Sequence, residues 1–348
     1  MTPSMNLVGM TTSQIMEWIS GFGEKPYRAQ QLADWIYKKR ATDFSVMTNI
    51  RKELRAELAL HAEIRYPRII EERHSQLDHT IKLLLGLGDG ELIETVIMQD
   101  NERNTICISS QVGCSLGCSF CATGELGFRR NLNCGEILSQ VLLAQNYLTH
   151  QKKRLNIVLM GMGEPLLNLD QVIPALRLLT LDEGLGLGKK RITLSTAGIP
   201  AGIRELADAD LGVKLALSLN ASDNIKRMAL MPVNRRYPLE DVLEGLHYYQ
   251  LNNRHRITFE YILIPGINNH PGDAEATLRL LRRFSYKINL IPYNPSVSLP
   301  YRSPTEDEIV SFSRLLMRGH GAVTIRRSRG ADIMAACGQL KARYEKEG

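Results

Sequence analysis

The sequence has few of the features that mark secreted or membrane proteins. Six cysteines in 348 residues are far fewer than a disulfide-stabilised scaffold carries. The chain starts MTPSMNLVGM, without the basic and then apolar pattern of a signal peptide. No apolar run approaches the ~20 residues of a membrane span. We therefore expect a cytoplasmic protein with reduced thiols and no membrane partner.

Histidine patterns are absent too, whereas basic residues are clustered. The eight histidines show no paired metal-binding spacing, so none is assigned a role. The formal charge is +6 with a pI near 9.0, which permits an anionic partner such as nucleic acid. The short basic runs, each of which alone is typical of a solvated face, are Lys38–Arg40, Lys152–Arg154, Lys189–Arg191, Arg235–Arg236 and Arg326–Arg329.

The distribution of apolar residues predicts two units. Residues 1–95 are expected to form an accessory unit, with helices near 11–23, 26–40 and 51–61 and a hairpin over 81–98. From about residue 96 to 348, strands alternate with amphipathic segments, which is typical of a parallel sheet or a βα barrel. The expected strands are 104–110, 156–162, 191–196, 213–220, 256–264, 287–294 and 322–328.

Three cysteines stand in the run GCSLGCSFCATG, with the spacing C-x3-C-x2-C. Cys114, Cys118 and Cys121 follow an expected strand, so they belong on the first βα loop. Three thiolates at this spacing favour a 4Fe–4S cluster with one iron open to a substrate. A zinc site stays open if Cys107 or Cys134 supplies a fourth ligand, although no second cysteine pair exists.

Polar residues gather at the ends of other expected strands, where ligands bind in such folds. The run GMGEP carries glycines that allow close approach to a ligand, and Glu164 could receive an ammonium group. Ser195, Ser218, Asn220 and Asn294 follow later strands; each alone is more typical of turn and cap chemistry. Cys337 and Cys134, taken in isolation, are more typical of buried small hydrophobes.

Several of these motifs together resemble the RlmN/Cfr family of radical-SAM RNA methyltransferases. The resemblance rests on CISSQVGCSLGCSFCATGELGFRRNL, MGMGEPLLN, TLSTAG, KINLIPYNP, DIMAACGQL and, near the N-terminus, GEKPYRAQQLADWIY. It spans nearly the whole chain and implies an α/β fold: a partial (β/α)6 barrel with a small N-terminal helical domain that contacts RNA. The Cfr branch has alanine after the glutamate of GMGEP, so Pro165 favours the carbon-2 branch.

The resemblance also implies a reaction, the methylation of carbon 2 of adenosine 2503 in 23S rRNA. Adenosine 37 of certain tRNAs is a second target in some members, and tRNA is left open here. Cys337 would take a methyl group from one S-adenosylmethionine (SAM), and the cluster would reduce a second SAM to a 5′-deoxyadenosyl radical. That radical would remove hydrogen from methyl-Cys337, Glu94 would take the carbon-2 proton, and Cys107 would release the product by forming a disulfide with Cys337. Without the resemblance, Glu94 is more typical of a surface carboxylate on a hairpin.

The ligands follow from the same resemblance. The cluster would be held by Cys114, Cys118 and Cys121, and an external electron donor is needed. The matching SAM contacts are Gly163, Glu164, Ser195, Ser218, Leu219, Asn220 and Asn294, where Asn220 departs from members with histidine. The alternatives are a Cfr-like carbon-8 methyltransferase and a zinc-stabilised RNA-binding protein without catalysis.

Overall fold

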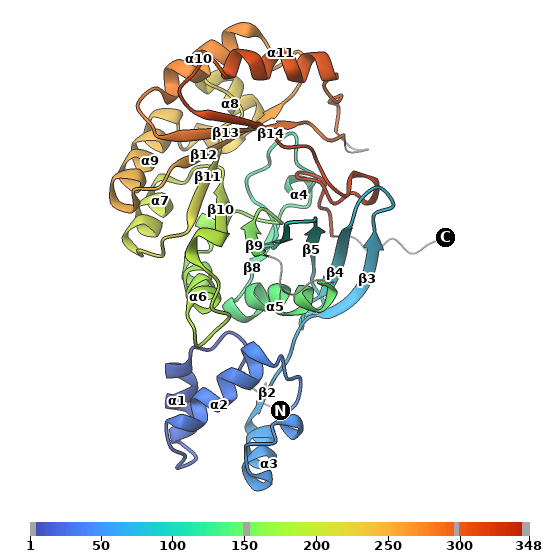
Figure 1. The fold of residues 1–348 in the computed structure, drawn as a ribbon, viewed down its shortest axis with the longest axis vertical. Coiled ribbons are helices and arrows are strands. Elements are labelled where there is room, and N and C mark those ends of the chain that lie inside the picture. The colour runs from blue at the N-terminus through green and yellow to red at the C-terminus, as the bar shows by residue number, and fades with distance from the viewer. Residues whose placement is uncertain (1–4, 149–153, 296–298, 343–348) are drawn as a thin grey trace.

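The computed structural model describes residues 5–148, 154–295 and 299–342, and its core is one large open sheet (Figure 1). Ten strands lie in the order β14-β13-β12-β11-β10-β9-β6-β5-β4-β3. From β14 to β6 all neighbours are parallel, and β5, β4 and β3 extend that sheet in antiparallel fashion. The strands are β3 Arg68–His74, β4 Thr80–Gly86, β5 Leu92–Gln99, β6 Arg103–Cys107, β9 Arg154–Leu159, β10 Ile192–Thr196, β11 Lys214–Ser218, β12 Ile257–Leu263, β13 Tyr286–Pro292 and β14 Ala322–Ile325.

Helices connect the parallel strands and cover one side of the sheet (Figure 1). Apolar helix residues such as Leu206 and Leu246 are buried and belong to one hydrophobic core with apolar residues of the strands. The strand–helix alternation and the curved open sheet confirm the predicted partial barrel. The helices are α4 Ala122–Glu125, α5 Cys134–Ala144, α6 Leu169–Thr180, α7 Pro200–Asp208, α8 Asn224–Leu230, α9 Leu239–Asn253, α10 Pro271–Leu281 and α11 Glu306–Leu316.

The N-terminal helices form a lobe at one end of the barrel (Figure 1). They are α1 Thr12–Ser20, α2 Tyr27–Ala33, which continues as a π-helix over Asp34–Lys38, and α3 Lys52–His61. Two short parallel strands, β1 Met5–Asn6 and β2 Ala62–Glu63, close the lobe. Gly9 packs so tightly on α5 that a Cβ there would lie 2.4 Å from the Gly135 nitrogen. The three predicted helices are confirmed.

The predicted hairpin is present, but its strands lie in the main sheet. β4 pairs antiparallel with β5, and β5 pairs with β6. β5 is buried on nearly its whole length, so it needs cover on both faces, which an isolated hairpin on a helical lobe would not supply. The sheet therefore continues across the division expected at residue 95. An unpredicted strand, β3, adds the outer edge, and its alternation is too polar to stand out in sequence.

The basic runs differ in what the structure shows of them. Lys152 and Lys153 lie outside the described residues. Arg326, Arg327 and Arg329 follow β14 and line a cavity described below. No helix in the described ranges combines the length and apolar character needed to cross a membrane.

Candidate active site

The three-cysteine run lies on the loop after β6 and the short strand β7 Gln111–Gly113, at the carboxyl end of the first parallel strand. Position 113 needs glycine, because its φ is +73° and a Cβ there would lie 1.8 Å from the Gly127 carbonyl oxygen. The loop is fixed to α8, since the Ser119 N–H donates to the Leu230 carbonyl at 2.9 Å. The predicted place of this motif, the first βα loop, is confirmed.

One cavity brings the cysteine loop together with the polar ends of later strands. Cys114, Cys118 and Cys121 line it from one element. Cys337, from the C-terminal segment, lies in the same wall, although it is far away in sequence. Of the residues expected to bind SAM, those that line this cavity are Gly163, Glu164, Ser195 and Ser218.

The cysteine loop fits an iron–sulfur cluster. All three cysteines are free thiols. Burial raises the pKa of the Cys118 thiol well above its ordinary value, and repulsion by Cys121 and Cys114 raises it further. Three neighbouring thiolates therefore need positive charge between them, which iron supplies. In the described part of the chain no group of three or more His, Cys, Asp or Glu side chains is arranged to hold one metal ion. Cys114, Cys118 and Cys121 would instead hold a 4Fe–4S cluster and leave one iron without a protein ligand.

Glu164 presents a carboxylate to this cavity from the GMGEP loop. The side chain is buried, and burial raises its pKa, whereas the N–H groups of Ala197 (2.7 Å) and Leu166 (3.0 Å) donate to its two oxygens and oppose that shift. Gly163 has φ +100°, and a Cβ there would lie 2.5 Å from the Gln111 Cβ. The loop is thus held in one conformation with a fixed acceptor for an amino group.

The other three residues expected to contact SAM differ in their burial and hydrogen bonding. Leu219 is fully buried and does not line the cavity. Asn220 has φ +58°, and its side chain accepts from the Ile262 N–H at 2.9 Å and donates to the Met231 sulfur at 3.2 Å. Its amide therefore links the loop after β11 to β12 and to the residue that follows α8. Asn294 has a buried Nδ2 with no hydrogen-bond partner among the described residues, which suits a ligand contact.

Sequence reasoning missed Glu260, which lines the cavity from β12. Its carboxylate accepts from the Ser195 hydroxyl at 3.0 Å and lies 3.4 Å from the Arg326 guanidinium. The available signal was a single acid in the otherwise apolar strand ITFEYIL. A buried charge in such a strand requires partners, and here both partners belong to the site.

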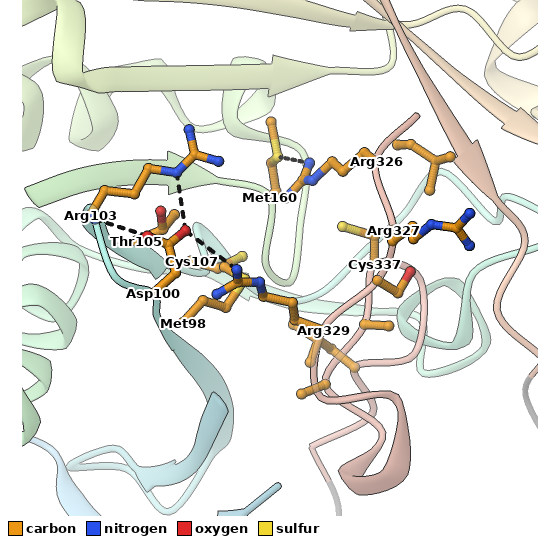
Figure 2. A pocket seen from close by; sticks show the side chains of 15 residues that line it. Met98, Asp100, Arg103, Thr105, Cys107, Met160, Arg326, Arg327, Arg329 and Cys337 are labelled. Carbon is orange, nitrogen blue, oxygen red and sulfur yellow. Dashed lines mark hydrogen bonds and ion pairs between the residues drawn. The ribbon is translucent and has the colours of Figure 1, made fainter. Parts of the chain in front are cut away.

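A second cavity, drawn in Figure 2, adjoins the first. Met160, Ile291 and Cys337 line both cavities. Cys107, the last residue of β6, lines the second one, and Figure 2 shows it across the cavity from Cys337. Burial raises the pKa of Cys107 to about 12, with Cys337 raising it and Arg326 opposing. Cys337 therefore lines both the cavity of the three-cysteine loop and the cavity that contains Cys107.

The C-terminal segment is hydrogen-bonded to the core directly after Cys337. The Ala122 N–H donates to the Gly338 carbonyl at 2.7 Å, and the Thr123 hydroxyl donates to the Leu340 carbonyl at 2.7 Å. These bonds join the segment to α4, which begins directly after Cys121. No sequence pattern predicts this contact, because it pairs residues more than half the chain apart.

Glu94 lies beneath the same segment and is almost fully buried, 4% exposed. It forms an ion pair with Lys82 at 2.9 Å, and its other oxygen accepts from the Lys341 N–H at 2.7 Å. Burial raises its pKa, and Lys82 opposes that rise. Val96 of β5 lies opposite Cys107 of β6, so their side chains are on the same face of the sheet. Glu94 is two residues before Val96 and therefore shares that face. The surface position that the residue pattern favoured is wrong.

Arg227 is a fully buried cation beside the cysteine loop. Its guanidinium donates to the carbonyl oxygens of Ala197 and Ser218 and to the Asn234 side chain. No carboxylate is among its partners in the described ranges. Burial lowers its pKa to about 10, and the nearby Cys118 thiolate opposes that shift. The arginine thus supplies a positive charge next to the proposed cluster ligands.

Comparison with known proteins agrees with this geometry. Residues 5–64 match the ribosomal RNA large subunit methyltransferase N-terminal domain, and residues 108–281 match the radical SAM superfamily. A dual-specificity RNA methyltransferase RlmN of Oleidesulfovibrio alaskensis is 46% identical, over 93% of this chain and 92% of that protein. The RlmN of Solidesulfovibrio magneticus is 42% identical over 99% and 98%.

The chain belongs to the RlmN family. It is an enzyme, an RNA methyltransferase of the radical SAM superfamily. The crystal structure of a radical SAM methyltransferase from Sphaerobacter thermophilus is similar throughout, with a TM-score of 0.93, 41% identity and coverage of 97% of this chain and 100% of that one. The resemblance stated from the motifs is confirmed. Superfamily membership implies a 4Fe–4S cluster and SAM as the cofactors.

Proposed function

We propose that this RlmN-family enzyme methylates carbon 2 of adenosine 2503 in 23S rRNA, and that adenosine 37 of tRNA is a further substrate. The observation that carries the proposal is the position of Cys337 in the wall shared by two cavities. A methyl carrier must face its donor on one side and its acceptor on the other. Carbon 2 of adenine has no nucleophilic lone pair, so a carrier and a radical route suit this atom.

We propose that Cys114, Cys118 and Cys121 hold the cluster, with one iron left for SAM. Glu164 would bind the SAM amino group, and Ser195, Ser218 and Asn294 would contact the rest of the molecule. Leu219 and Asn220 would support the residues that line the SAM cavity, since the Asn220 side chain is hydrogen-bonded to Ile262 and Met231. When bound, the two cofactors supply the methyl group and the means of removing one of its hydrogens, with electrons from an external donor and two SAM used per turnover.

The chain's own side chains perform the remaining steps. The Cys337 thiolate accepts the methyl group, and the methylene unit derived from it bonds to carbon 2. Glu94 takes the carbon-2 proton, which requires its carboxylate to be ionised. The adduct must also give up its one unpaired electron, which balances the electron that the external donor supplied. Cys107 then attacks the Cys337 sulfur as a thiolate, and the bond from that sulfur to the transferred carbon breaks. That carbon keeps the electron pair and takes up a proton to become the methyl group, while a Cys107–Cys337 disulfide forms. A reductant must reopen the disulfide before the next turnover.

Nucleoside mass spectrometry of rRNA and tRNA tests the proposal, using a strain without its own copy of this gene and the same strain complemented with it. We expect 2-methyladenosine in the complemented strain only. A product carrying 8-methyladenosine instead would contradict the carbon-2 assignment. A protein that purifies anaerobically with zinc, without iron or sulfide, would contradict the radical route.

A further inference from the structure

The cavity that contains Cys107 and Cys337 is lined by several arginines, and their charges are not equally compensated (Figure 2). Arg326 has Glu260 at 3.4 Å, and Arg327 has Glu306 at 2.6 Å. Arg103 and Arg329 share a single carboxylate, that of Asp100. Two guanidinium groups and one carboxylate leave net positive charge at this place.

Asp100 holds these arginines with one oxygen. Its Oδ2 lies 3.5 Å from the Arg103 Nε and 3.3 Å from an Arg329 terminal nitrogen. Its Oδ1 accepts from the N–H groups of Glu102 and Arg103, both at 2.9 Å, and so shapes the turn between β5 and β6. The two functions are therefore divided between the two oxygens of one carboxylate.

We propose that Arg103 and Arg329 form a phosphate-binding subsite for the RNA, in which a backbone phosphate takes the place of the Asp100 carboxylate. The inference rests on the proposed function and deepens it, because it states how the nucleotide that enters the Cys107–Cys337 cavity is positioned. Asp100 keeps the two guanidinium groups together in the free enzyme. The RNA then receives a preformed pair of donors rather than two disordered side chains.

The chemistry of the groups favours this exchange. A guanidinium group matches phosphate oxygens with paired N–H donors and is always charged. Phosphate contacts position a nucleic acid, whereas base contacts select it. Partly exposed ion pairs contribute little to stability, so loss of the Asp100 contacts is a small penalty. Arg103 and Arg329 are 63% and 37% exposed in their side chains, so a phosphate can reach both.

The subsite also lies where the reaction needs it. Arg329 belongs to the run that leads from β14 toward Cys337, and its Nη1 donates to the Gln99 carbonyl at 3.0 Å. Arg103 is on β6, four residues before Cys107. A phosphate bound by Arg103 and Arg329 would thus lie at the cavity that Cys107 and Cys337 line. A target base must leave its stack to enter such a cavity, and a fixed neighbouring phosphate supports that position.

RNA affinity measurements on four variants test the subsite. The probe is a fluorescein-labelled transcript of the 23S rRNA segment around adenosine 2503, titrated with reconstituted full-length enzyme at several salt concentrations. We expect Arg103→Gln and Arg329→Gln each to weaken binding several-fold and to lower the salt slope by about 0.7 for each lost contact to single-stranded RNA. Asp100→Asn should strengthen binding several-fold, and Asp100→Asn combined with Arg329→Gln should lose that gain.

The matched controls are Arg204→Gln and Glu244→Gln, which remove an exposed ion pair of 3.3 Å between α7 and α9. Both should bind RNA as the wild type does. The proposal is overturned if Asp100→Asn leaves binding unchanged or weakens it, or if the arginine variants keep the wild-type salt slope. Nucleoside analysis of the same RNA after incubation with wild-type enzyme reports the proposed methylation separately. A methylated product with unaltered variant affinities would overturn the subsite alone, and arginine-dependent binding without product would contradict the methylation alone.

Discussion

Lys82 and Glu94 form an ion pair of 2.9 Å beneath the segment that carries Cys337. Lys82 also donates to the Met334 carbonyl, and Glu94 accepts from the Lys341 N–H, so the pair holds that segment on either side of Cys337. Both side chains are almost fully buried, at 7% and 5% exposure. The proposed base and the proposed methyl carrier are therefore linked through the backbone of one segment.

Replacing Lys82 by methionine should shift the pH dependence of methylation. Burial raises the pKa of Glu94 and Lys82 opposes the rise, so removing Lys82 raises that pKa further. Because the base acts as a carboxylate, the acid limb of the single-turnover rate should move to higher pH. The variant should also unfold more easily, by about 3–5 kcal/mol for a broken buried pair.

The control for this prediction is Lys82→Arg, which retains the charge and should retain the acid limb. The raised pKa of Glu94 also affects how the stability of the fold depends on pH. A carboxyl whose folded pKa is raised binds more protons when folded, so its contribution to stability falls as pH rises from its unfolded pKa to its folded pKa. An acid limb that does not move in Lys82→Met would show that Glu94 is not the base.

Replacing Cys107 by alanine should separate methyl transfer from product release. Cys337 can still accept and pass on the methyl group, but no thiol at position 107 can attack its sulfur. We expect RNA to accumulate in covalent attachment to the protein, detected as retarded RNA on a denaturing gel. The double variant Cys107→Ala, Cys337→Ala should give no such species. Normal multiple turnover by Cys107→Ala would contradict the proposed release step.

Replacing Arg227 by methionine should make the cluster harder to reduce. A buried positive charge near the Cys118 thiolate favours the more negative, reduced cluster. Its loss should lower the midpoint potential by on the order of 50 mV, about 1 kcal/mol of Coulomb energy in a protein environment. An anaerobic redox titration followed by electron paramagnetic resonance measures this value. The variant Arg227→Lys keeps the charge and should have a midpoint potential close to that of the wild type. An unchanged potential in Arg227→Met would show that Arg227 has only a structural role.

Replacing Gly163 by alanine should abolish SAM binding. The residue has φ +100°, and the added Cβ would lie 2.5 Å from the Gln111 Cβ, so the loop carrying Glu164 must move. Gly266→Ala is the control, because φ there is +78° and the added Cβ meets nothing within 4 Å. Equilibrium dialysis with labelled SAM should show lost affinity only for Gly163→Ala. Equal affinity in both variants would exclude Gly163 from the SAM site.

The sequence predicted those parts of the site that are local in the chain. The C-x3-C-x2-C run and the GMGEP loop each follow a strand, and parallel strands bring their carboxyl ends to one edge. This reasoning predicts that Glu164 lies near the cysteine loop, and both line one cavity. The strand–helix alternation likewise predicted the partial barrel, because each helix must return the chain to the next parallel strand.

Contacts between distant segments could not be predicted in this way. Glu94 reads as an exposed hairpin residue until the C-terminal segment covers it and Lys82 pairs with it. The bonds from the Asn220 amide to Ile262 and Met231 likewise have no signal in the sequence, because these partners come from other elements. The sequence places the hairpin next to the N-terminal helices, but it does not show that β5 pairs with β6 of the main sheet.

The most direct test of the account is mass spectrometry of the reconstituted enzyme after incubation with methyl-labelled SAM in the absence of RNA. The account predicts labelled methyl on the peptide that carries Cys337, on no other cysteine peptide, and its transfer to RNA in a single turnover once RNA and reductant are added. Labelled RNA formed without prior label on Cys337, or stable label on Cys107 instead, would contradict the assignment of Cys337 as the methyl carrier between the two cavities.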